Sequence, residues 1–433
     1  MDASGSTKQR RDAGLIFEAA VAAVSPAVFL PAHLPAPPAS GQLAIFAAGK
    51  AAGAMAAAAE AFYLDQHGFP VERLSGAAIS RHGYGLPLKA LHSLEAGHPV
   101  PDDAGLAATE ALINHAKALP PETPVVFLLS GGASACLVAP AAGLTLADKQ
   151  ALTRTLLRAG VPIDGMNILR KHLSRVKGGR LAGLITGRPL TTLALSDVPG
   201  DDLSLIGSGP TIPDPSTLDD ARGVLARFGI TPAPAIAAAL ANPAQETPKP
   251  GDAIFAQCTA KVVARPADAF AAACAKAQAL GYQVVDLGAS LEGEARDVAK
   301  THAGAALRLR GQGQRLALIS GGELTVTLKG NGRGGPNQEY ALALAIALDG
   351  ACGIAGLSGD TDGTDGGVGA ASDPAGAFFD ASTLGRAAAL GLDAGAMLEN
   401  NDSTGFFGAL GDLHTPGPTF TNANDLRIIL IED

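Results

Sequence analysis

The sequence predicts an α/β protein of two domains, and three features of the chain support this. Its 433 residues exceed what one typical hydrophobic core needs and suit two domains of ordinary size. Short apolar runs are repeatedly followed by a glycine-containing turn and then by a helical stretch rich in Ala and Leu. A polar, proline-rich stretch without periodicity, at 242–251, interrupts this pattern.

The apolar runs are the expected strands. Because they are continuous rather than alternating, we expect buried parallel strands that are joined by helical crossovers. The candidates are 43–48, 125–129, 190–196, 283–287, 315–319, 324–328, 353–357 and 426–431.

The stretch 242–251 also gives the expected domain boundary. We predict an N-terminal α/β domain at 1–245 and a smaller α/β domain at 246–433. A second proline-rich stretch, 31–40, is short and reads as a loop between the first helix and the first strand.

Charge and composition exclude several classes of protein. The net charge is −9, aromatic residues make up 4%, and no long Lys/Arg-rich run occurs, so we expect no nucleic-acid partner. The four cysteines form no C-x-x-C pair, which argues against a disulfide framework or a zinc site. The N-terminus lacks the apolar core of a signal peptide and no run of 18 apolar residues exists, so we expect no membrane association and a cytoplasmic location.

Small polar residues follow the expected strands, on the side where α/β sheets bind ligands. Gly49-Lys50 follows the first strand and opens a helix, where a lysine adds charge for a phosphate or carboxylate. After the second strand, Ser130, Gly131, Gly132 and Ser134 form a turn that lets backbone amides approach an anion. In each case an ordinary surface lysine, or a turn that is merely tight, remains the structural alternative. Ser134 as a hydrolase nucleophile is disfavoured, because G-x-S-x-G fails at position 136.

Two further segments of the first half carry charge. The stretch 167–180 is the densest basic segment, and Lys177, just before two glycines, is the member best placed to contact a substrate or phosphate. A solvated helix face would explain most of the others. Asp197 lies just beyond the third strand, where a catalytic or metal-binding carboxylate usually lies.

The second half repeats the glycine-rich pattern. Ser320, Gly321, Gly322 and Glu323 echo the turn at 130–132. Further on, residues 330, 332 and 335 formally satisfy G-x-G-x-x-G, which would indicate a dinucleotide site and an NAD-dependent reductase. Arg333 occupies the turn that should lie against pyrophosphate, and the acidic residue expected about 20 positions on would fall at a helix end. We therefore interpret the loop as a mount that presents Arg333 to anionic oxygens, with Asn337 in the first turn of the following helix.

The segment 358–367 holds three aspartates within six residues. It fails as an EF-hand, because the twelfth position, 371, is Ala. The carboxylates of Asp360 and Asp362 suit Mg²⁺ shared with nucleotide phosphates, and a loop that its own side chains cap is the alternative.

Six strings together resemble one family: AAGKAAGAMA, SGGASA, SDVPGDDLSLIGSGPT, SGGE with GNGRGGPNQE, SGDTDGTDG and NNDSTGFF. In this order they resemble the class II glycerate kinases, the glycerate 2-kinases whose C-terminal part is called the MOFRL domain. The resemblance covers nearly the whole chain, 17–431. Members of the family have also been labelled hydroxypyruvate reductases.

The resemblance implies a larger Rossmann-like N-terminal domain, a smaller MOFRL-type α/β domain and an active site in the cleft between them. It implies phosphorylation of D-glycerate to 2-phosphoglycerate, with ATP and Mg²⁺. Lys50 and Arg333 match the family residues associated with phosphoryl transfer, while Asp197 and Glu323 match acidic residues of the cleft.

From these considerations we assign the candidate residues by role. Lys50, Arg333 and Asp197 are catalytic; Ser130, Gly131, Gly132, Ser134, Lys177 and Glu323 bind substrate or phosphate; Ser320, Gly321, Gly322, Asn337, Asp360 and Asp362 bind nucleotide; Asp197 and Asp360 bind the metal. An NAD(P)H-dependent hydroxypyruvate reductase and a non-catalytic anion-binding protein stay open as alternatives, and a homodimer is compatible with the sequence.

Overall fold

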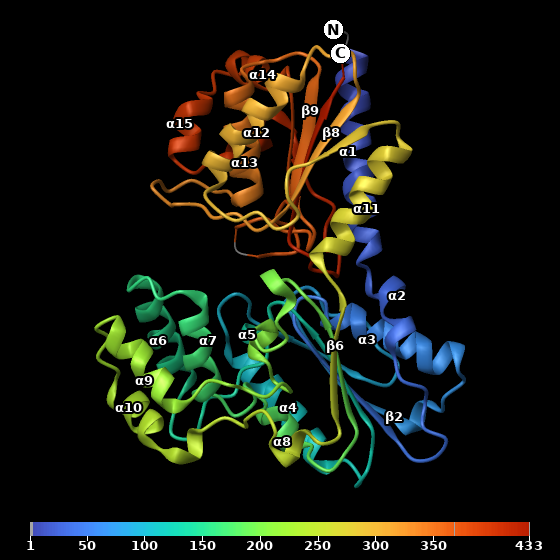
Figure 1. Ribbon diagram of the computed structural model, residues 1–433, viewed down its shortest axis with the longest axis vertical. Coiled ribbons are helices and arrows are strands. Elements are labelled where there is room, and N and C mark those ends of the chain that lie inside the picture. The colour runs from blue at the N-terminus through green and yellow to red at the C-terminus, as the bar shows by residue number, and fades with distance from the viewer. Residues whose placement is uncertain (1–2, 368, 433) are drawn as a thin grey trace. The chain divides into compact units, whose positions relative to one another are not determined.

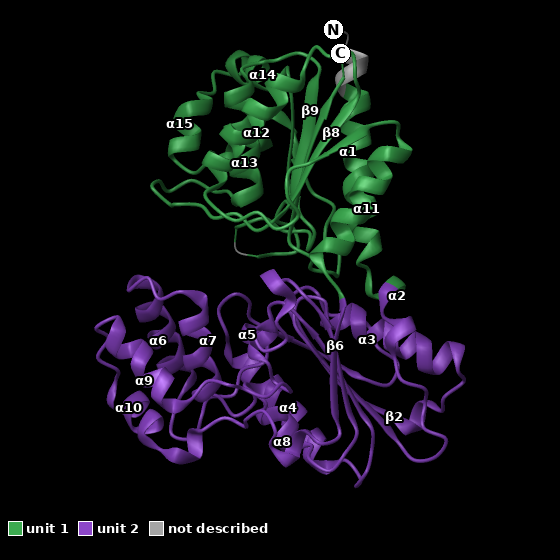
Figure 2. Ribbon diagram, in the orientation of Figure 1, with its two compact units in different colours: residues 1–28, 264–433 green, residues 29–263 purple. Residues whose placement is uncertain are grey.

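The computed structural model describes residues 3–367 and 369–432. The chain divides into two compact units, which Figure 2 distinguishes by colour. Unit 1 comprises residues 1–28 and 264–433, and unit 2 comprises residues 29–263.

Unit 2 is built on a six-stranded sheet in the order β3-β2-β1-β4-β5-β6. Its strands are β1 (Leu43–Ala48), β2 (Leu74–Arg81), β3 (His92–Ala96), β4 (Val125–Ser130), β5 (Leu190–Leu195) and β6 (Cys258–Ala264). The ladders β1–β2, β2–β3, β1–β4 and β4–β5 are all parallel. This is the strand order of a doubly wound, Rossmann-like sheet, in which the order reverses beside β1. The loops that follow β1 and β4 therefore flank the topological switch point, where such sheets bind ligands.

The helices of unit 2 fall into two groups (Figure 1). One group packs on the sheet and consists of α3 (Ala52–Glu60), α4 (Asp103–Ala118), α5 (Ala133–Cys136) and α8 (Arg180–Leu184). The other has an apolar core of its own and consists of α6 (Leu146–Arg158), α7 (Ile163–His172), α9 (Leu218–Arg227) and α10 (Pro234–Ala241). The short helix α2 (Pro26–Phe29) lies where the chain passes from unit 1 into unit 2, which begins at Phe29.

Unit 1 has a second six-stranded sheet, in the order β11-β10-β9-β12-β8-β7. Its strands are β7 (Gln283–Asp286), β8 (Leu316–Gly322), β9 (Ile354–Asp360), β10 (Gly376–Asp380), β11 (Leu413–His414) and β12 (Asp425–Ile431). The prediction of parallel strands holds for β7 and β8 but is wrong for the rest of this sheet, because β12 runs antiparallel between β8 and β9, and β10 is antiparallel to β9. The last strand of the chain, β12, thus lies in the middle of the sheet and runs opposite to its two neighbours. Its apolar sequence predicts a buried strand but gives neither its neighbours nor its direction.

Helices cover both faces of this sheet (Figure 1). On one face lie α1 (Ala3–Ala23) and α11 (Pro266–Ala279), whose alanines pack against β8, β9 and β12. The other face is covered by α12 (Ala295–Leu309), α13 (Pro336–Leu348), α14 (Thr383–Ala389), α15 (Ala394–Glu399) and α16 (Ser403–Leu410). The predicted α/β fold class with two domains is confirmed.

The units differ from the predicted domains at both ends. The N-terminal helix α1 belongs to unit 1, because Ile16 and Phe17 are buried in the core that the second sheet forms. The proline-rich stretch 242–251 is not the boundary between the units, because β6 follows it and completes the first sheet. Nothing in the local composition reveals either long-range contact. The predicted placement of the active site in a cleft between the domains stays a prediction.

Two local predictions also need correction. The segment 324–328 is not a strand, since it makes only an isolated bridge between Thr325 and Glu294 and leaves Leu328 exposed. Residues 320–322 are not a loop after a strand, because they are the last three residues of β8 and pair with β12.

Candidate functional site

Lys50 lies where the loop after β1 meets the loop after β4. Its backbone N–H donates to the carbonyl of Gly131 at 2.8 Å, and the Ala51 N–H donates to the Ser130 hydroxyl at 3.0 Å. Gly49 has a φ of 121°, and a Cβ there would lie 2.4 Å from the carbonyl oxygen of Ser130. The crossing of the two loops therefore requires glycine at 49 and fixes the backbone of the half-buried Lys50 beside the switch point of the sheet.

Ser130 has a structural partner in this arrangement. Its side chain is fully buried, and the Oγ atom accepts the Ala51 N–H at the start of α3. The sequence predicted a substrate or phosphate ligand at this position. The structure gives the hydroxyl a helix-capping contact instead, and its predicted binding role stays a prediction.

Gly131 and Gly132 form the turn that leads into α5, and Ser134 is the second residue of that helix. Gly132 is left-handed with a φ of 80°, and a Cβ there would lie 2.9 Å from Cγ of Lys50 and 3.1 Å from the His98 ring. Ser134 Oγ lies 2.7 Å from the hydroxyl of Ser208. The small residues thus let Lys50 and His98 approach the turn.

The basic segment 167–180 divides into paired and unpaired cations. Lys171 forms a buried ion pair with Asp214 at 3.2 Å and is therefore structural. Lys177 is 1% exposed, and its Nζ atom donates to the carbonyl of Leu137 at 2.7 Å. Burial, reinforced by the nearby cations Lys149 and Arg170, holds the pKa of Lys177 well below its usual range.

Asp197 follows β5 by two residues and is half-buried. The chain then turns through Gly207 and Gly209, which both adopt left-handed φ angles. Lys50 and Asp197 thus both follow strands of the first sheet at their carboxyl ends, as the sequence predicts.

In unit 1, the loop that carries Arg333 is held by a polar turn at the end of α15. The Asn401 Oδ1 atom accepts the N–H groups of Lys329 and Gly330 at 2.8 and 3.0 Å. Asp402 Oδ1 accepts the Arg333 N–H at 3.2 Å. The Arg333 side chain itself is 72% exposed and lies 3.9 Å from a carboxylate oxygen of Asp373. A rigid backbone therefore presents an exposed guanidinium, which agrees with the interpretation of the loop as a mount.

The glycines of this loop serve close packing of backbone against backbone. A Cβ at Gly330 would lie 2.4 Å from the Asn400 carbonyl oxygen, and one at Gly332 would lie 2.4 Å from Cβ of Asp402. Their φ angles are not left-handed, so the requirement is space rather than backbone conformation. The glycines at 330 and 332, which in sequence suggest close approach to an anion, therefore serve to pack this loop against residues 400–402.

The start of α13 is occupied by a carboxylate of the chain itself. Asp365 accepts the backbone N–H groups of Asn337 and Gln338, both at 2.9 Å, and the side-chain amides of both residues. A Cβ at Gly335 would lie 2.4 to 2.5 Å from atoms of Asp365. Burial raises the pKa of Asp365 to about 6 in spite of these donors. A pyrophosphate has no place at this helix terminus, so the G-x-G-x-x-G string is not a dinucleotide site.

Several predicted nucleotide ligands also have partners within unit 1. Arg427, which is 1% exposed, donates to the Ser320 hydroxyl at 3.0 Å and to the carbonyls of Gly321 and Gly322. The Asn337 amide donates to Asp425 at 2.7 Å, and its oxygen accepts the Ser358 hydroxyl at 2.7 Å.

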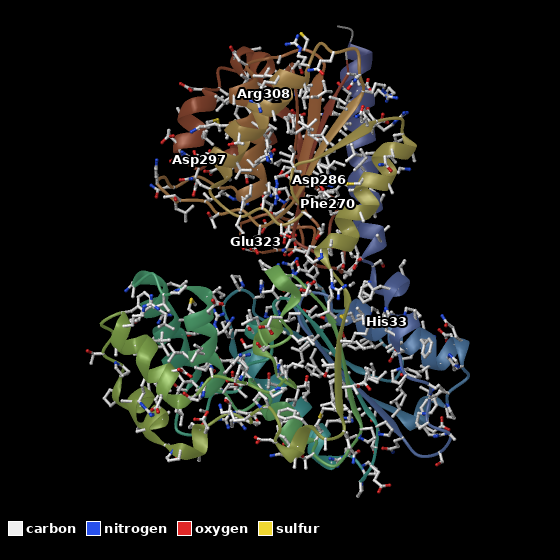
Figure 3. All side chains as sticks on the ribbon, in the orientation of Figure 1. His33, Phe270, Asp286, Asp297, Arg308 and Glu323 are labelled. Carbon is white, nitrogen blue, oxygen red and sulfur yellow. The ribbon has the colours of Figure 1, made fainter. Side chains whose placement is uncertain are left out.

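Glu323 is exposed and follows the last residue of β8 (Figure 3). Its position directly beyond a strand end is the one that the sequence predicts, and its binding role stays a prediction.

Asp360 and Asp362 cap their own loop. Asp360 Oδ1 accepts the Asp362 N–H at 2.8 Å, and Asp362 Oδ1 accepts the N–H and hydroxyl of Thr364. In the described part of the chain, no group of three or more His, Cys, Asp or Glu side chains could hold a metal ion. A magnesium ion bound chiefly through phosphates needs only one or two carboxylates, so Asp197 or Asp360 would suffice as a protein ligand.

Sequence reasoning missed several residues that shape these sites. Lys149 lies beside Lys177, but an isolated lysine on an amphipathic helix gives no sequence signal; Arg170, the other neighbouring cation, lies within the basic segment 167–180 that the sequence does indicate. Asn401 is buried and left-handed, with a φ of 55°, which the polar string 400–404 only hints at.

Two family models match the chain. A domain of unknown function, DUF4147, matches residues 12–241, and the MOFRL family matches residues 316–425. Over 82% of its length the chain is 39% identical to the D-glycerate 2-kinase of Thermotoga maritima, 84% of which is covered. The crystal structure of a glycerate kinase from Thermotoga maritima matches with a TM-score of 0.81 at 36% identity, covering 96% of this chain and 97% of that one. The chain belongs to the MOFRL-type glycerate kinase family.

Names within the family differ. The chain is 44% identical to a protein of Agrobacterium vitis that carries the provisional name hydroxypyruvate reductase, over 96% of this chain and 93% of the relative. The predicted family resemblance is confirmed by both kinds of match. Among the residues that the structure describes, no helix is long and apolar enough to cross a membrane.

Proposed function

We propose that this protein transfers the γ-phosphoryl group of ATP to D-glycerate and forms 2-phosphoglycerate. The observation that carries the proposal is the similarity to the D-glycerate 2-kinase of Thermotoga maritima, which extends over both family domains. The rigid placement of Lys50 at the switch point of the first sheet supports it, because phosphoryl transfer depends on positioned charge rather than on covalent chemistry.

Lys50 and Arg333 are the proposed cations of the reaction. The Lys50 ammonium is a point charge on a backbone that two hydrogen-bonded loops fix. Arg333 offers a planar guanidinium that can contact two oxygens of a phosphoryl group or carboxylate at once. Its side chain is 72% exposed, and within the part of the chain that the structure describes its guanidinium makes only a 3.9 Å ion pair with Asp373, so it is accessible to a ligand.

Asp197 is the proposed base toward the glycerate hydroxyl, or a ligand of the magnesium ion that accompanies ATP. When bound, Mg²⁺ would neutralise charge on the phosphate oxygens. Gly131, Gly132, Ser134 and Lys177 are proposed to contact phosphate or substrate beside Lys50. This role is compatible with the Ser134 hydroxyl, which lies at the turn and is only half-buried.

The test is turnover of the purified protein. Incubation with D-glycerate, ATP and Mg²⁺ should release ADP, and phosphorus NMR should identify the phosphate on the 2-hydroxyl. A folded protein that forms no ADP would refute the proposal, and a phosphate on the 3-hydroxyl would correct its regiochemistry.

Reduction of hydroxypyruvate by NAD(P)H is a second candidate, because a relative of 44% identity carries that name. The occupied N-terminus of α13 argues against it, since Asp365 takes the amides that a pyrophosphate would need. If the reductase reading holds, absorbance of reduced nicotinamide at 340 nm should fall when hydroxypyruvate is added. We expect no change beyond the rate without enzyme.

A further inference from the structure

A pocket of about 440 Å³ opens in unit 2 beside the turn that approaches Lys50. Its walls come from the segment after β3, from the turn and helix at 132–138, and from α6 and α7, which share one apolar core (Figure 1). Four cations line it: Lys149, Arg154, Arg170 and Lys177. No Asp or Glu is among the lining residues.

These cations lack counter-charges within the described residues. Lys177 Nζ donates to the carbonyl of Leu137 at 2.7 Å, and Lys149 Nζ donates to the carbonyl of Leu173 at 2.9 Å. Arg170 donates to the amide oxygen of Asn167 at 3.3 Å. Each acceptor is neutral, so no positive charge of the pocket is compensated by a carboxylate of the described chain.

A neighbouring lysine of the same segment does have an acidic partner, so the absence of carboxylates among the described residues is specific to the pocket. Lys171 follows Arg170 directly and is 4% exposed, yet it pairs with Asp214 at 3.2 Å. A buried lysine without such a partner is costly, because its charge has lost water and gained no anion. The low pKa of Lys177 reflects that cost, and burial also lowers the pKa of Lys149 to about 8. A bound anion would remove the cost.

The number of cations indicates what kind of anion fits. A single carboxylate, as in glycerate, would neutralise one of them and leave the others uncompensated. A triphosphate carries about four negative charges spread over three groups, which matches Lys149, Arg154, Arg170 and Lys177 in number. The hydroxyls of Ser134 and Thr153 lie in the same lining and can donate to phosphate oxygens.

The apolar rim of the pocket suits the rest of a nucleotide. Val100 and Leu157 both line the pocket, and each is 61% exposed, so their apolar surfaces are accessible to a ligand. Such surfaces can cover a flat heterocycle. The volume also falls within the range of pockets that hold small-molecule ligands.

The residues of unit 1 that the sequence predicted as nucleotide ligands are engaged elsewhere. Arg427 donates hydrogen bonds to the Ser320 hydroxyl and to the carbonyls of Gly321 and Gly322. Asp365 accepts the backbone N–H groups at the start of α13. The Asp365 carboxylate would have to leave before a phosphate could bind the N–H groups at the start of α13, and the Gly321 N–H already donates to the carbonyl of Gly288. We infer that the triphosphate of the nucleotide binds in the unit 2 pocket, where Lys149, Arg170 and Lys177 hold its phosphates. Calling the ligand the phosphoryl donor rests on the proposed function.

The experiment measures binding without turnover. Isothermal titration with ATP, inorganic tripolyphosphate and D-glycerate, each alone, is carried out on the parent and on Lys149→Met and Arg170→Met. Because a hydrogen bond to a charged group is typically worth a factor of about 10 to 100 in affinity, each variant should weaken both ATP and tripolyphosphate at least tenfold. D-Glycerate affinity should change less than twofold. Arg158→Met is the matched control, since Arg158 is exposed on the same helix and is not among the lining residues.

A competition on the parent protein guards against variants that misfold. Tripolyphosphate should displace a fluorescent ATP analogue, whereas millimolar D-glycerate should not. Unchanged ATP affinity in both folded variants would overturn the inference, and so would a selective loss of D-glycerate binding, which would make the pocket the acceptor site. Failure of the proposed function looks different: nucleotide binding would follow the variants as described, but no phosphoglycerate would form.

Discussion

Asn401 is the residue whose replacement tests most directly how the Arg333 loop is held. Its Oδ1 atom accepts the N–H groups of Lys329 and Gly330, and its Nδ2 atom donates to the buried carboxylate of Glu339 at 3.0 Å. The side chain is 3% exposed and the backbone is left-handed. Asn401→Ala removes these hydrogen bonds, together with longer ones from Nδ2 to the second Glu339 oxygen at 3.3 Å and to the Thr327 carbonyl at 3.4 Å. It also leaves a Cβ in a conformation that only Gly and Asn adopt readily.

The size of the effect follows from these contacts. The two bonds to backbone N–H groups are worth about 1 kcal/mol each, and the bond to a carboxylate is worth about 2 kcal/mol. Part of this loss is recovered, because Lys329 is exposed and its N–H can bind water. We therefore expect Asn401→Ala to lower the free energy of unfolding by about 3 to 4 kcal/mol. Asn401→Gly should lose about 1 kcal/mol less, because it relieves the left-handed strain.

Urea unfolding followed by far-ultraviolet circular dichroism measures the loss, and hydrogen exchange read by mass spectrometry locates it. Amides of 329–335 should exchange faster in the variant, and turnover should fall as Arg333 loses its fixed position. Asn400→Ala is the control: Asn400 is exposed and its side chain accepts one bond, from Asn331, so about 0.5 kcal/mol is expected. Equal destabilisation by both variants, or unchanged exchange in 329–335, would refute the reasoning.

Three further predictions concern the two units. Arg333→Ala should lower kcat/KM at least 100-fold with D-glycerate and ATP while changing the free energy of unfolding by less than about 0.5 kcal/mol, because the side chain is 72% exposed; a parental rate would count against its role. Gly335→Ala should destabilise the protein by about 2 kcal/mol or more in urea unfolding, because its Cβ would lie 2.4 Å from the backbone of Asp365, whereas Gly385→Ala, in open space on α14, should stabilise it by up to about 1 kcal/mol. The affinity for ATP, measured by titration, should fall as the pH rises through about 8, because Lys149 has a pKa of about 8 and loses its charge above it; Lys149→Met should remove that part of the dependence.

Local sequence was sufficient for three buried strands of the first sheet, but it did not indicate the buried strand β2, whose run LSGAAISR is interrupted by small and polar residues. The run 43–48 coincides with β1, and 125–129 and 190–196 fall within one residue of β4 and β5. These strands are apolar on both faces, so the pattern and the structure carry the same information. The shorter and more polar β3 and β11 gave no such signal, because they lie at sheet edges and bury less.

For the candidate site too, the sequence predicted the features that depend on neighbouring residues and missed those that depend on distant ones. The sequence indicates that Lys50, Asp197 and Glu323 lie beyond strand ends, because this depends on neighbours in the chain. It could not assign the glycines of 330–335, since their role depends on Asn400, Asp402 and Asp365, which lie 30 to 70 positions further on. Glycines in a sequence indicate that some group packs closely against the backbone, but they do not show whether that group is a ligand or another part of the chain.

By itself, the sequence determined the fold class, the family and the loops in which charge is placed, because each of these is written in contiguous residues. The tertiary structure alone decided which cations have partners. Lys171 and Lys177 are both buried lysines of one basic segment, yet one meets Asp214 and the other meets only a carbonyl and neighbouring positive charge. The structure likewise decided that α1 completes unit 1 and that β12 runs antiparallel in its sheet. Pairing between distant residues depends on where the folded backbone brings them, and no local pattern specifies that.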